Sequence, residues 1–363
     1  MSQSVPRSFT VDVLKVVAAQ LIVWHHLSAY GPMSDALQLA WPTLVTHIYH
    51  DARLAVQVFL VIGGFLAART LGAKTLSHPL QTFARRYLRL APPYLLAVAA
   101  ISVTVAVARP MIDANWLPAA PSAGQFMAHA LLLNALLDIP SLSSGVWYAA
   151  IDFQLYVLFG FLVFGLQKLG AKALSIGVAL VCTSSLLWFN RAEHYDNWAI
   201  YFFGAYGLGI LAAWAKRSRF DGYLFALMAV VTVLALWLEL RTRIALALLT
   251  AVILAVRPQV ARLQWSWAIK SVHRFSDSAY ALFLTHFGVI VLFSAVWNRL
   301  HLSGAVAAMG VMLLAWWSSV GVGLLFHSHA EVPLNRWLAR QSKAMYDTTM
   351  LALPWAAWRH QRR

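Results

Sequence analysis

Long apolar runs separated by short polar segments are the dominant pattern along this chain. A run of about 20 apolar residues is long enough to cross a membrane as an α-helix, and the polar segments between the runs hold most of the charged residues. The pattern predicts an all-α, polytopic membrane bundle of about ten transmembrane helices. The predicted spans are residues 11–30, 52–71, 88–108, 145–166, 173–189, 198–214, 222–239, 243–256, 277–297 and 303–326.

Composition and charge agree with a membrane protein. Hydrophobic residues make up 61% of the chain and charged residues 11%, about half the charge of a soluble domain. Of the 28 lysines and arginines, 22 fall on one side of the predicted spans and 6 on the other. This asymmetry predicts that both termini are cytosolic, and it explains most of the net charge of +15 without a nucleic-acid partner. The six residues predicted to be external are Arg53, Arg109, Arg191, Arg241, Arg243 and Arg299.

Two sequence features narrow the protein class further. The first apolar run is followed by more spans and has no small-residue cleavage site, so we expect no cleavable signal peptide. The single cysteine, Cys182, lies inside an apolar run and excludes a disulfide framework or a cysteine-based metal site. There is no Walker loop, serine-centred nucleophile elbow or dinucleotide fingerprint.

The first predicted span carries ionisable residues: Asp12, Lys15, His25 and His26. Ionisable groups inside a membrane are costly and usually functional. Lys15 and His26 are eleven residues apart, about three helical turns and roughly 16 Å, which returns to nearly the same helix face. His25 points about 100° away. This stripe favours His26 as a reactive imidazole; the alternative is a hydrogen bond to a neighbouring helix.

Further candidates lie in later spans. Arg86 and Arg89 are three residues apart and share a helix face, which suits a phosphate-bearing ligand; anchoring to lipid headgroups is the alternative. Asp152 lies about two turns inside its span, where a carboxylate needs a partner such as a histidine or a substrate hydroxyl. For His286, another buried imidazole, a structural hydrogen bond is the favoured role. The paired glycines Gly63 and Gly64 are typical of close helix packing.

Two external segments allow more than one interpretation. Residues 109–144 fit a lid or re-entrant piece over an external substrate, or a plain loop with an interfacial helix over 125–137. His47, His50 and Asp51 have a spacing that suits a metal, but no third strong ligand is evident nearby. An interfacial helix is preferred there, and no metal site is predicted.

Taken in order, these motifs resemble the membrane-bound acyltransferase 3 family over nearly the whole chain. The first span resembles that family's opening pattern of an aspartate, a basic residue, ten residues and a histidine. Later matches are an apolar segment ending in Gly-Phe, a basic loop, a Trp-x4-acid-x3-Tyr pattern and closing signatures. The matching residues are Asp12, Lys15, His26, Phe59–Phe65, Arg86, Arg89, Pro92, Tyr94, Trp147, Asp152, Tyr156, Tyr280, His286, Glu331 and Pro333.

The chain departs from the family pattern at four positions. Lys15 stands where arginine is usual, which loses the bidentate fork of a guanidinium. Asp152 stands where glutamate is usual and is one methylene shorter. Gly63 replaces a serine, and Gln57 stands where aspartate is common. These differences suggest a divergent subfamily with a different donor, acceptor or activity.

The resemblance implies an integral-membrane O-acyltransferase. Such enzymes move an acyl group, commonly acetyl, from cytosolic acyl-CoA to a hydroxyl of an envelope or exported glycan. Catalytic roles then fall to His26, as general base or transient acyl carrier, and to Asp152, which would orient the imidazole. Lys15, Arg86 and Arg89 would bind the donor phosphates, and acyl-CoA is a co-substrate rather than a permanently bound cofactor. The supporting residues are Asp12, Trp147, Tyr156, Tyr280 and His286.

The same resemblance predicts the setting of the protein. Residues 1–335 would form a single transmembrane domain and 336–363 a basic cytosolic tail, in a bacterial inner membrane. Expected partners are a glycan or glycolipid acceptor and membrane lipids, with a homo-oligomer or glycan-synthesis machinery left open. Two other classes also stay open. A proton-coupled transporter would use the histidines and aspartate as a relay, and in a structural subunit of a polysaccharide synthase His26 would be dispensable.

Overall fold

The computed structural model describes residues 7–72, 75–112, 114–256 and 266–351. It is 82% helical, and the described residues form no strand, so the prediction of an all-α fold is confirmed. The longer helices are α1 (Phe9–Ala29), α3 (Pro42–Ala52), α4 (Ala55–Thr70), α5 (Pro79–Ala108), α7 (Trp147–Leu166), α8 (Ala171–Leu187), α9 (Ala199–Trp214), α10 (Arg219–Leu238), α11 (Thr242–Val256), α12 (Ser266–Asp277), α13 (Ala279–Arg299), α14 (Ala305–Phe326) and α15 (Val332–Leu351).

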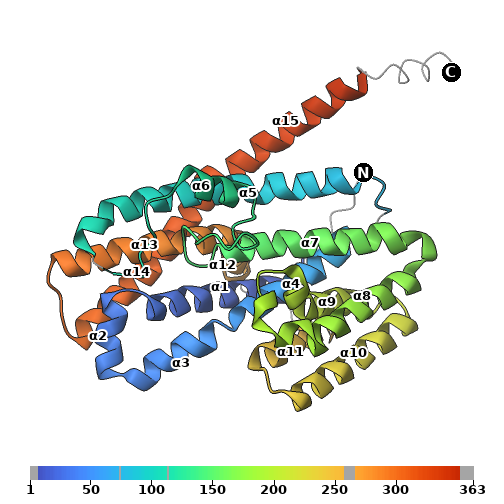
Figure 1. Ribbon diagram of the computed structural model, residues 1–363, viewed down its shortest axis with the longest axis horizontal. Coiled ribbons are helices and arrows are strands. Elements are labelled where there is room, and N and C mark those ends of the chain that lie inside the picture. Colours follow the sequence, from blue (N-terminus) through green and yellow to red (C-terminus); the bar gives the residue numbers. More distant parts are fainter. Residues whose placement is uncertain (1–6, 73–74, 113, 257–265, 352–363) are drawn as a thin grey trace.

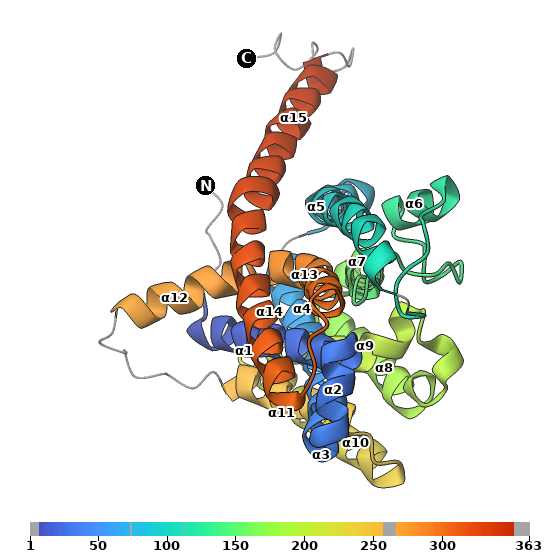
Figure 2. The same cartoon turned by 90° about the vertical axis from the view of Figure 1, so that its left-hand side faces the viewer.

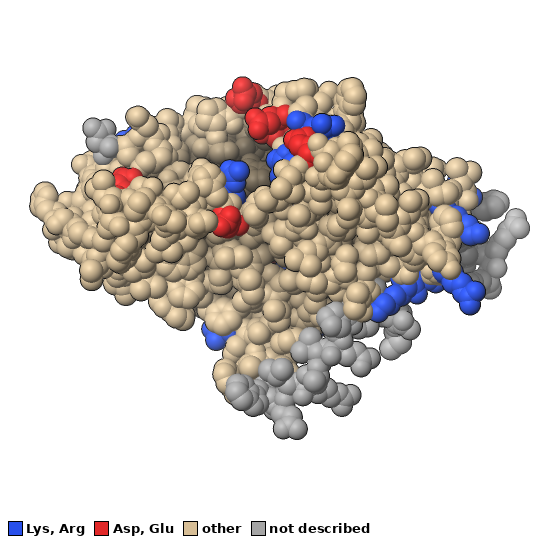
Figure 3. All heavy atoms as spheres, turned by 90° about the horizontal axis from the view of Figure 1, so that it is seen from below, with Lys and Arg blue, Asp and Glu red and all other residues tan. Residues whose placement is uncertain are grey.

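Eight helical segments in the described part are long and apolar enough to cross a membrane. Two more apolar helices, α9 and α11, are shorter. These ten helices lie at the positions of the ten predicted spans, but the count of ten and the cytosolic termini stay predictions. Most of the face seen in Figure 3 is uncharged. Large apolar side chains such as Trp237 on α10, 81% exposed, project from the bundle, as expected where helices face lipid.

Several long helices lie roughly side by side along the long axis of the molecule (Figure 1). Helix α1 packs against α3, α4, α12 and α13. Helix α15 leaves the bundle obliquely, as Figures 1 and 2 show. The predicted boundary between the domain and its tail, at residues 335 and 336, falls inside α15, and residues 352–363 lie outside the described part.

Helix α9 lies at the centre of one half of the bundle. It is apolar all round, and 14 of its 16 residues are buried, which is the pattern of a helix enclosed by others. A Cβ atom on Gly64 of α4 would lie 1.9 Å from the carbonyl oxygen of Tyr206, and one on Gly209 would lie 2.0 Å from that of Val61. The backbones of α4 and α9 are therefore in contact, as predicted for Gly64.

The segment 109–144 is held against α5 by polar contacts. Its helix, α6 (Ala123–Ala130), is shorter than the predicted run of 125–137. His129 is fully buried; its Nδ1 lies 2.5 Å from the hydroxyl of Tyr94, and the backbone N–H of Leu142 donates to its Nε2 at 3.2 Å. Tyr87 donates to the carbonyl of Ala130 at 2.5 Å. Side chains of α5 thus anchor this segment at several points.

We expect the stability of the protein to fall on acidification because of His129. Burial lowers the pKa of this imidazole, and the hydrogen bond from Leu142 requires its lone pair. The unfolded chain therefore binds the proton more readily, so stability is lost as the pH falls through the ordinary histidine pKa of about 6.5. Thermal melting in detergent at about pH 7.5 and about pH 5.5 measures this loss. The loss should be smaller in His129→Gln; an identical pH dependence in both proteins would contradict the assignment.

Candidate active site

Two buried histidines from distant parts of the chain form the centre of the candidate site. His26 lies near the end of α1 and His286 lies in α13. The Nδ1 of His26 is 2.6 Å from the Nε2 of His286. The ring planes are nearly parallel and the rings meet edge to edge, with centroids 4.8 Å apart and an interplanar angle of 11°. The sequence favoured a structural hydrogen bond for His286 and kept a hydrogen bond to a neighbouring helix as the alternative for His26. The structure pairs the two histidines with each other.

The hydrogen-bond chain through these histidines fixes their tautomers. The Nδ1 of His286 lies 3.0 Å from the carbonyl oxygen of Leu282. A carbonyl only accepts, so this Nδ1 carries the proton and, in the neutral ring, Nε2 is a bare acceptor. His26 must then donate its Nδ1–H to His286. The remaining ring nitrogen of His26, Nε2, keeps its lone pair, as a base or nucleophile requires.

The neighbouring histidine faces a different part of the bundle. His25 is only partly buried, and its Nδ1 donates to the carbonyl of Tyr49 on α3 at 2.8 Å. The separation of about 100° between adjacent helical residues accounts for this difference. The helical spacing therefore singled out, from the two adjacent histidines, the one that contacts α13.

Two of the cavities beside α1 form the candidate site, one near each end of the helix. Lys15 lines the first, of about 200 Å³, and His26 lines the second, of about 620 Å³. Phe283 lines both; its ring centroid is 5.5 Å from that of Tyr148 and 6.2 Å from that of His286. A molecule that reached from the first cavity to His26 would therefore pass this phenylalanine.

The first cavity contains a buried ion pair. Arg86 of α5 donates to the carboxylate of Asp152 on α7, and its guanidinium lies 5.1 Å from the ring centroid of Tyr156. The predicted contact between Asp152 and His26 is thus wrong: the aspartate pairs with Arg86. The reason is that α5 packs directly on α7 and brings a long guanidinium to the carboxylate, whereas α13 supplies the partner of His26.

The other predicted donor-binding residues line the same cavity. The Nζ of Lys15 donates to the carbonyl of Ser276 at 2.8 Å, and Arg89 is exposed at the cavity wall. Tyr280 also lines it and donates its hydroxyl to the carbonyl of Leu90 at 3.0 Å. Trp147, in contrast, lines the second cavity, where its ring stacks on Phe202 at 5.7 Å. Of the supporting residues, Tyr280 therefore lines the first cavity and Trp147 the second.

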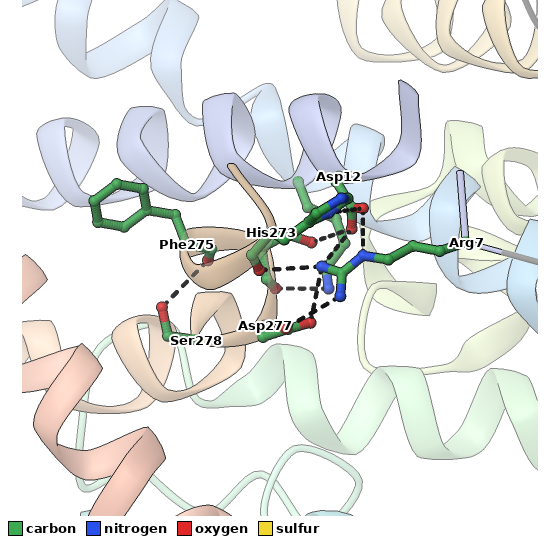
Figure 4. Close-up of polar contacts among 8 residues, drawn as sticks. Arg7, Asp12, His273, Phe275, Asp277 and Ser278 are labelled. Carbon is green, nitrogen blue, oxygen red and sulfur yellow. Dashed lines mark hydrogen bonds and ion pairs between the residues drawn. The ribbon is translucent and has the colours of Figure 1, made fainter. Parts of the chain in front are cut away.

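Asp12 anchors the start of α1 to α12 (Figure 4). Its carboxylate accepts from the Nε of Arg7 at 2.7 Å, from Ser276 at 2.6 Å and from the Nδ1 of His273 at 2.9 Å. Arg7 also forms an ion pair with Asp277 at 3.1 Å, and its hydrogen bond to Asp12 raises the pKa of Arg7. Because Lys15 and Asp277 both line the first cavity, this cluster fixes the cavity's edge.

The residues with a metal-like spacing in the first external segment, His47, His50 and Asp51, lie on α3. His47 contacts Asp51 at 3.2 Å, and both side chains are about 70% exposed. Across the described ranges, no three histidine, cysteine, aspartate or glutamate side chains are grouped so that they could hold a metal ion.

Comparison with known proteins identifies the family. A family model described as an acyltransferase domain matches residues 9–327. This span includes both histidines and all the residues that line the two cavities except Glu331. The chain belongs to the acyltransferase 3 family. Membership in this family, together with the apolar helices, indicates a multi-pass integral membrane protein with acyltransferase activity.

A curated animal protein is also similar to this acyltransferase 3 family member. "Regulator of hypoxia-inducible factor 1" from Caenorhabditis elegans is 24% identical over 199 residues, which cover 50% of this chain and 39% of that protein. This chain therefore corresponds to well under half of that relative's length. No solved structure matches.

Proposed function

We propose that this protein is an acyl-CoA-dependent O-acyltransferase that moves an acetyl group from the cytosol to a hydroxyl of an envelope or exported glycan. One observation carries the proposal. His26, hydrogen-bonded through Nδ1 to His286, lines the second cavity, and the first cavity, which has basic side chains, lies along the same helix. This arrangement suits an anionic donor on one side and a hydroxyl acceptor on the other.

The donor would occupy the first cavity. The phosphates of acyl-CoA carry several negative charges, which cationic side chains bind through charge-assisted hydrogen bonds. Lys15 and Arg89 offer such groups at the cavity wall. Arg86 is already paired with Asp152, and this pair is neutral overall, so one role of Arg86 is to hold α5 against α7. Its buried Nε, which has no hydrogen-bond partner among the described residues, would donate to a phosphate of the donor. The thioester would extend past Phe283 toward His26, which lies in the other cavity.

The reaction then uses the free Nε2 of His26. The acceptor hydroxyl gives its proton to Nε2 while its oxygen attacks the thioester carbonyl carbon. The carbon–sulfur bond breaks, and the departing CoA thiolate takes the proton back from the imidazolium. His286 accepts the Nδ1–H of His26 throughout and so stabilises the charged ring. A route through an acyl-histidine needs the same lone pair, because Nε2 itself would attack the carbonyl.

Labelled acetyl-CoA tests the proposal directly. We expect the purified protein to release free CoA thiol and to transfer label to a glycan fraction from the cell envelope. Both products should appear together, since the carbon–sulfur bond breaks as the ester forms. A folded protein that releases no thiol above background with any acceptor fraction would overturn the proposal and return the transporter hypothesis to first place.

His286 is expected to act as a positioning residue for His26. His286→Ala should lower kcat by about tenfold to a hundredfold, as for loss of an orienting hydrogen bond, with little change in the KM for the donor. It should also move the pH–rate profile, because His26 is no longer held in one tautomer. His286→Gln, whose amide oxygen can still accept, should recover part of the rate. Equal losses in both variants with an unchanged profile would indicate a purely structural role.

A further inference from the structure

Arginines gather at the second cavity, on the side where the charge asymmetry predicts few basic residues. Three of the six predicted external residues, Arg53, Arg241 and Arg243, line this cavity together with His26. The positive-inside rule accounts for scarcity on that side, but it does not account for their convergence on one cavity. A ligand that needs positive charge explains the convergence.

Arg241 is the most informative of the three. It is 8% exposed, and its Nη1 and Nη2 donate to Asn190 Oδ1 at 2.7 Å and to the carbonyl of Leu186 at 2.8 Å. Both acceptors are uncharged, and within the described residues its buried Nε has no hydrogen-bond partner. A buried charge without a counter-ion is costly. Glu239 acts on this guanidinium electrostatically, but it is already paired with Arg191 at 2.7 Å. Arg241 therefore keeps an unused donor at the cavity wall and, among the described residues, is hydrogen-bonded to uncharged acceptors.

The surroundings of Arg241 increase the attraction for an anion. Arg243 donates to the carbonyl of Asn190 at 2.8 Å and lies 4.9 Å from the ring of Tyr201, so its contacts are also uncharged. Helix α11 begins at Thr242, and the first backbone N–H groups of a helix favour negative charge. Glu193 and Asp196 line the same cavity but are exposed, which leaves the buried Arg241 end as the favourable position.

We infer that the second cavity binds an acidic acceptor. A carboxylate or phosphate on the acceptor sugar would lie at Arg241 and Arg243, and a hydroxyl of the same molecule would reach His26. The cavity volume of about 620 Å³ is within the range of small-molecule sites. This inference rests on the proposed transferase function for the role of the hydroxyl, but the anion site itself can be measured by binding alone.

Binding of three small probes tests the site. The probes are methyl β-D-glucuronide, glucose 6-phosphate and the uncharged methyl β-D-glucoside, each titrated into the purified full chain in detergent. We expect one or both charged probes to bind about tenfold to a hundredfold more tightly than the glucoside, and the preference between them identifies a carboxylate or a phosphate.

Arg243→Gln and Arg53→Gln should each weaken the preference for the charged probes over the glucoside. Arg299→Gln is the matched control, because Arg299 is also predicted to be external, is exposed and does not line the cavity. Arg241 is left intact because its bonds to Asn190 and Leu186 hold the start of α11 against α8.

The outcomes separate this inference from the proposed function. If the charged probes bind no better than the glucoside, or if Arg243→Gln behaves like Arg299→Gln, the acidic acceptor site is overturned whatever the enzyme assay shows. If the charged probes bind through Arg243 but no acceptor is ever acetylated, the site stands and the transferase proposal fails. Acetylation of a glucuronide or of a phosphorylated sugar, lost in Arg243→Gln and kept in Arg299→Gln, supports both.

Discussion

His26→Ala is expected to abolish measurable acyl transfer while the protein stays folded. The Nε2 lone pair of His26 is the base or nucleophile in both routes considered, and removal of a general base typically costs about 10²- to 10⁴-fold in rate. The substitution also removes one half of a buried hydrogen bond, so His286 loses its donor. Some loss of thermal stability is therefore expected, without unfolding.

His25→Ala is the matched control for this variant. The two residues are adjacent on α1, but His25 bonds to the backbone of Tyr49 rather than to His286. Its loss should lower transfer by only a few-fold at most, by loss of one hydrogen bond at the cavity edge. Acetyl transfer by each purified variant, with thermal melting as the folding check, measures both effects. Near-normal turnover in His26→Ala beside an inactive His25→Ala would mean that the helical stripe identified the wrong histidine.

The fold could be predicted from the sequence because its cause is local. Each apolar run is long enough to cross a membrane or to be buried in the bundle. The length and composition of the run alone therefore predict a helix at that position. Even the short helices α9 and α11 lie where apolar runs were predicted. Helix α9 is buried on all sides, and a helix enclosed by other helices has the same apolar sequence as one that faces lipid. The close approach of α4 and α9 was signalled by the glycines at 63 and 64.

The candidate site could be predicted only in part, because its contacts join distant helices. Helical spacing identified His26 over His25, but it reports which face of α1 is used and not which helix covers that face. The partner of His26 is 260 residues away, and the partner of Asp152 is 66 residues away. By analogy with a catalytic triad, Asp152 was expected to orient His26. In the structure His26 contacts His286, and Asp152 contacts Arg86.

The arginines of the second cavity show the same limit. Counting basic residues placed Arg241 and Arg243 on the sparsely charged side, where each alone is a minor exception to the charge rule. Their convergence with His26 depends on how the turn between α10 and α11 lies against α8 and α9, which no local pattern in the sequence specifies.

Removing either member of the Arg86–Asp152 pair is expected to give the largest loss of stability. Breaking a buried ion pair leaves an uncompensated charge and costs about 3–5 kcal/mol. Asp152 is 7% exposed, whereas the Arg86 side chain is 26% exposed. Arg86→Ala, which strands the more buried carboxylate, should therefore be at the upper end of that range. Asp152→Glu should be mild, because the charge is kept and the added methylene still reaches α5.

The double variant Arg86→Met/Asp152→Leu separates stability from function. Replacing both charges with apolar groups removes the stranded charge, so its melting temperature should return close to that of the unmodified protein. If the pair serves only to join α5 to α7, acyl transfer should return with it. We expect transfer to stay low and the donor KM to stay high, since the first cavity would lose the N–H groups of Arg86, including its unpartnered Nε, beside Lys15 and Arg89. A stable double variant with full turnover would remove Arg86 and Asp152 from the donor site and leave them as a structural clamp between two helices.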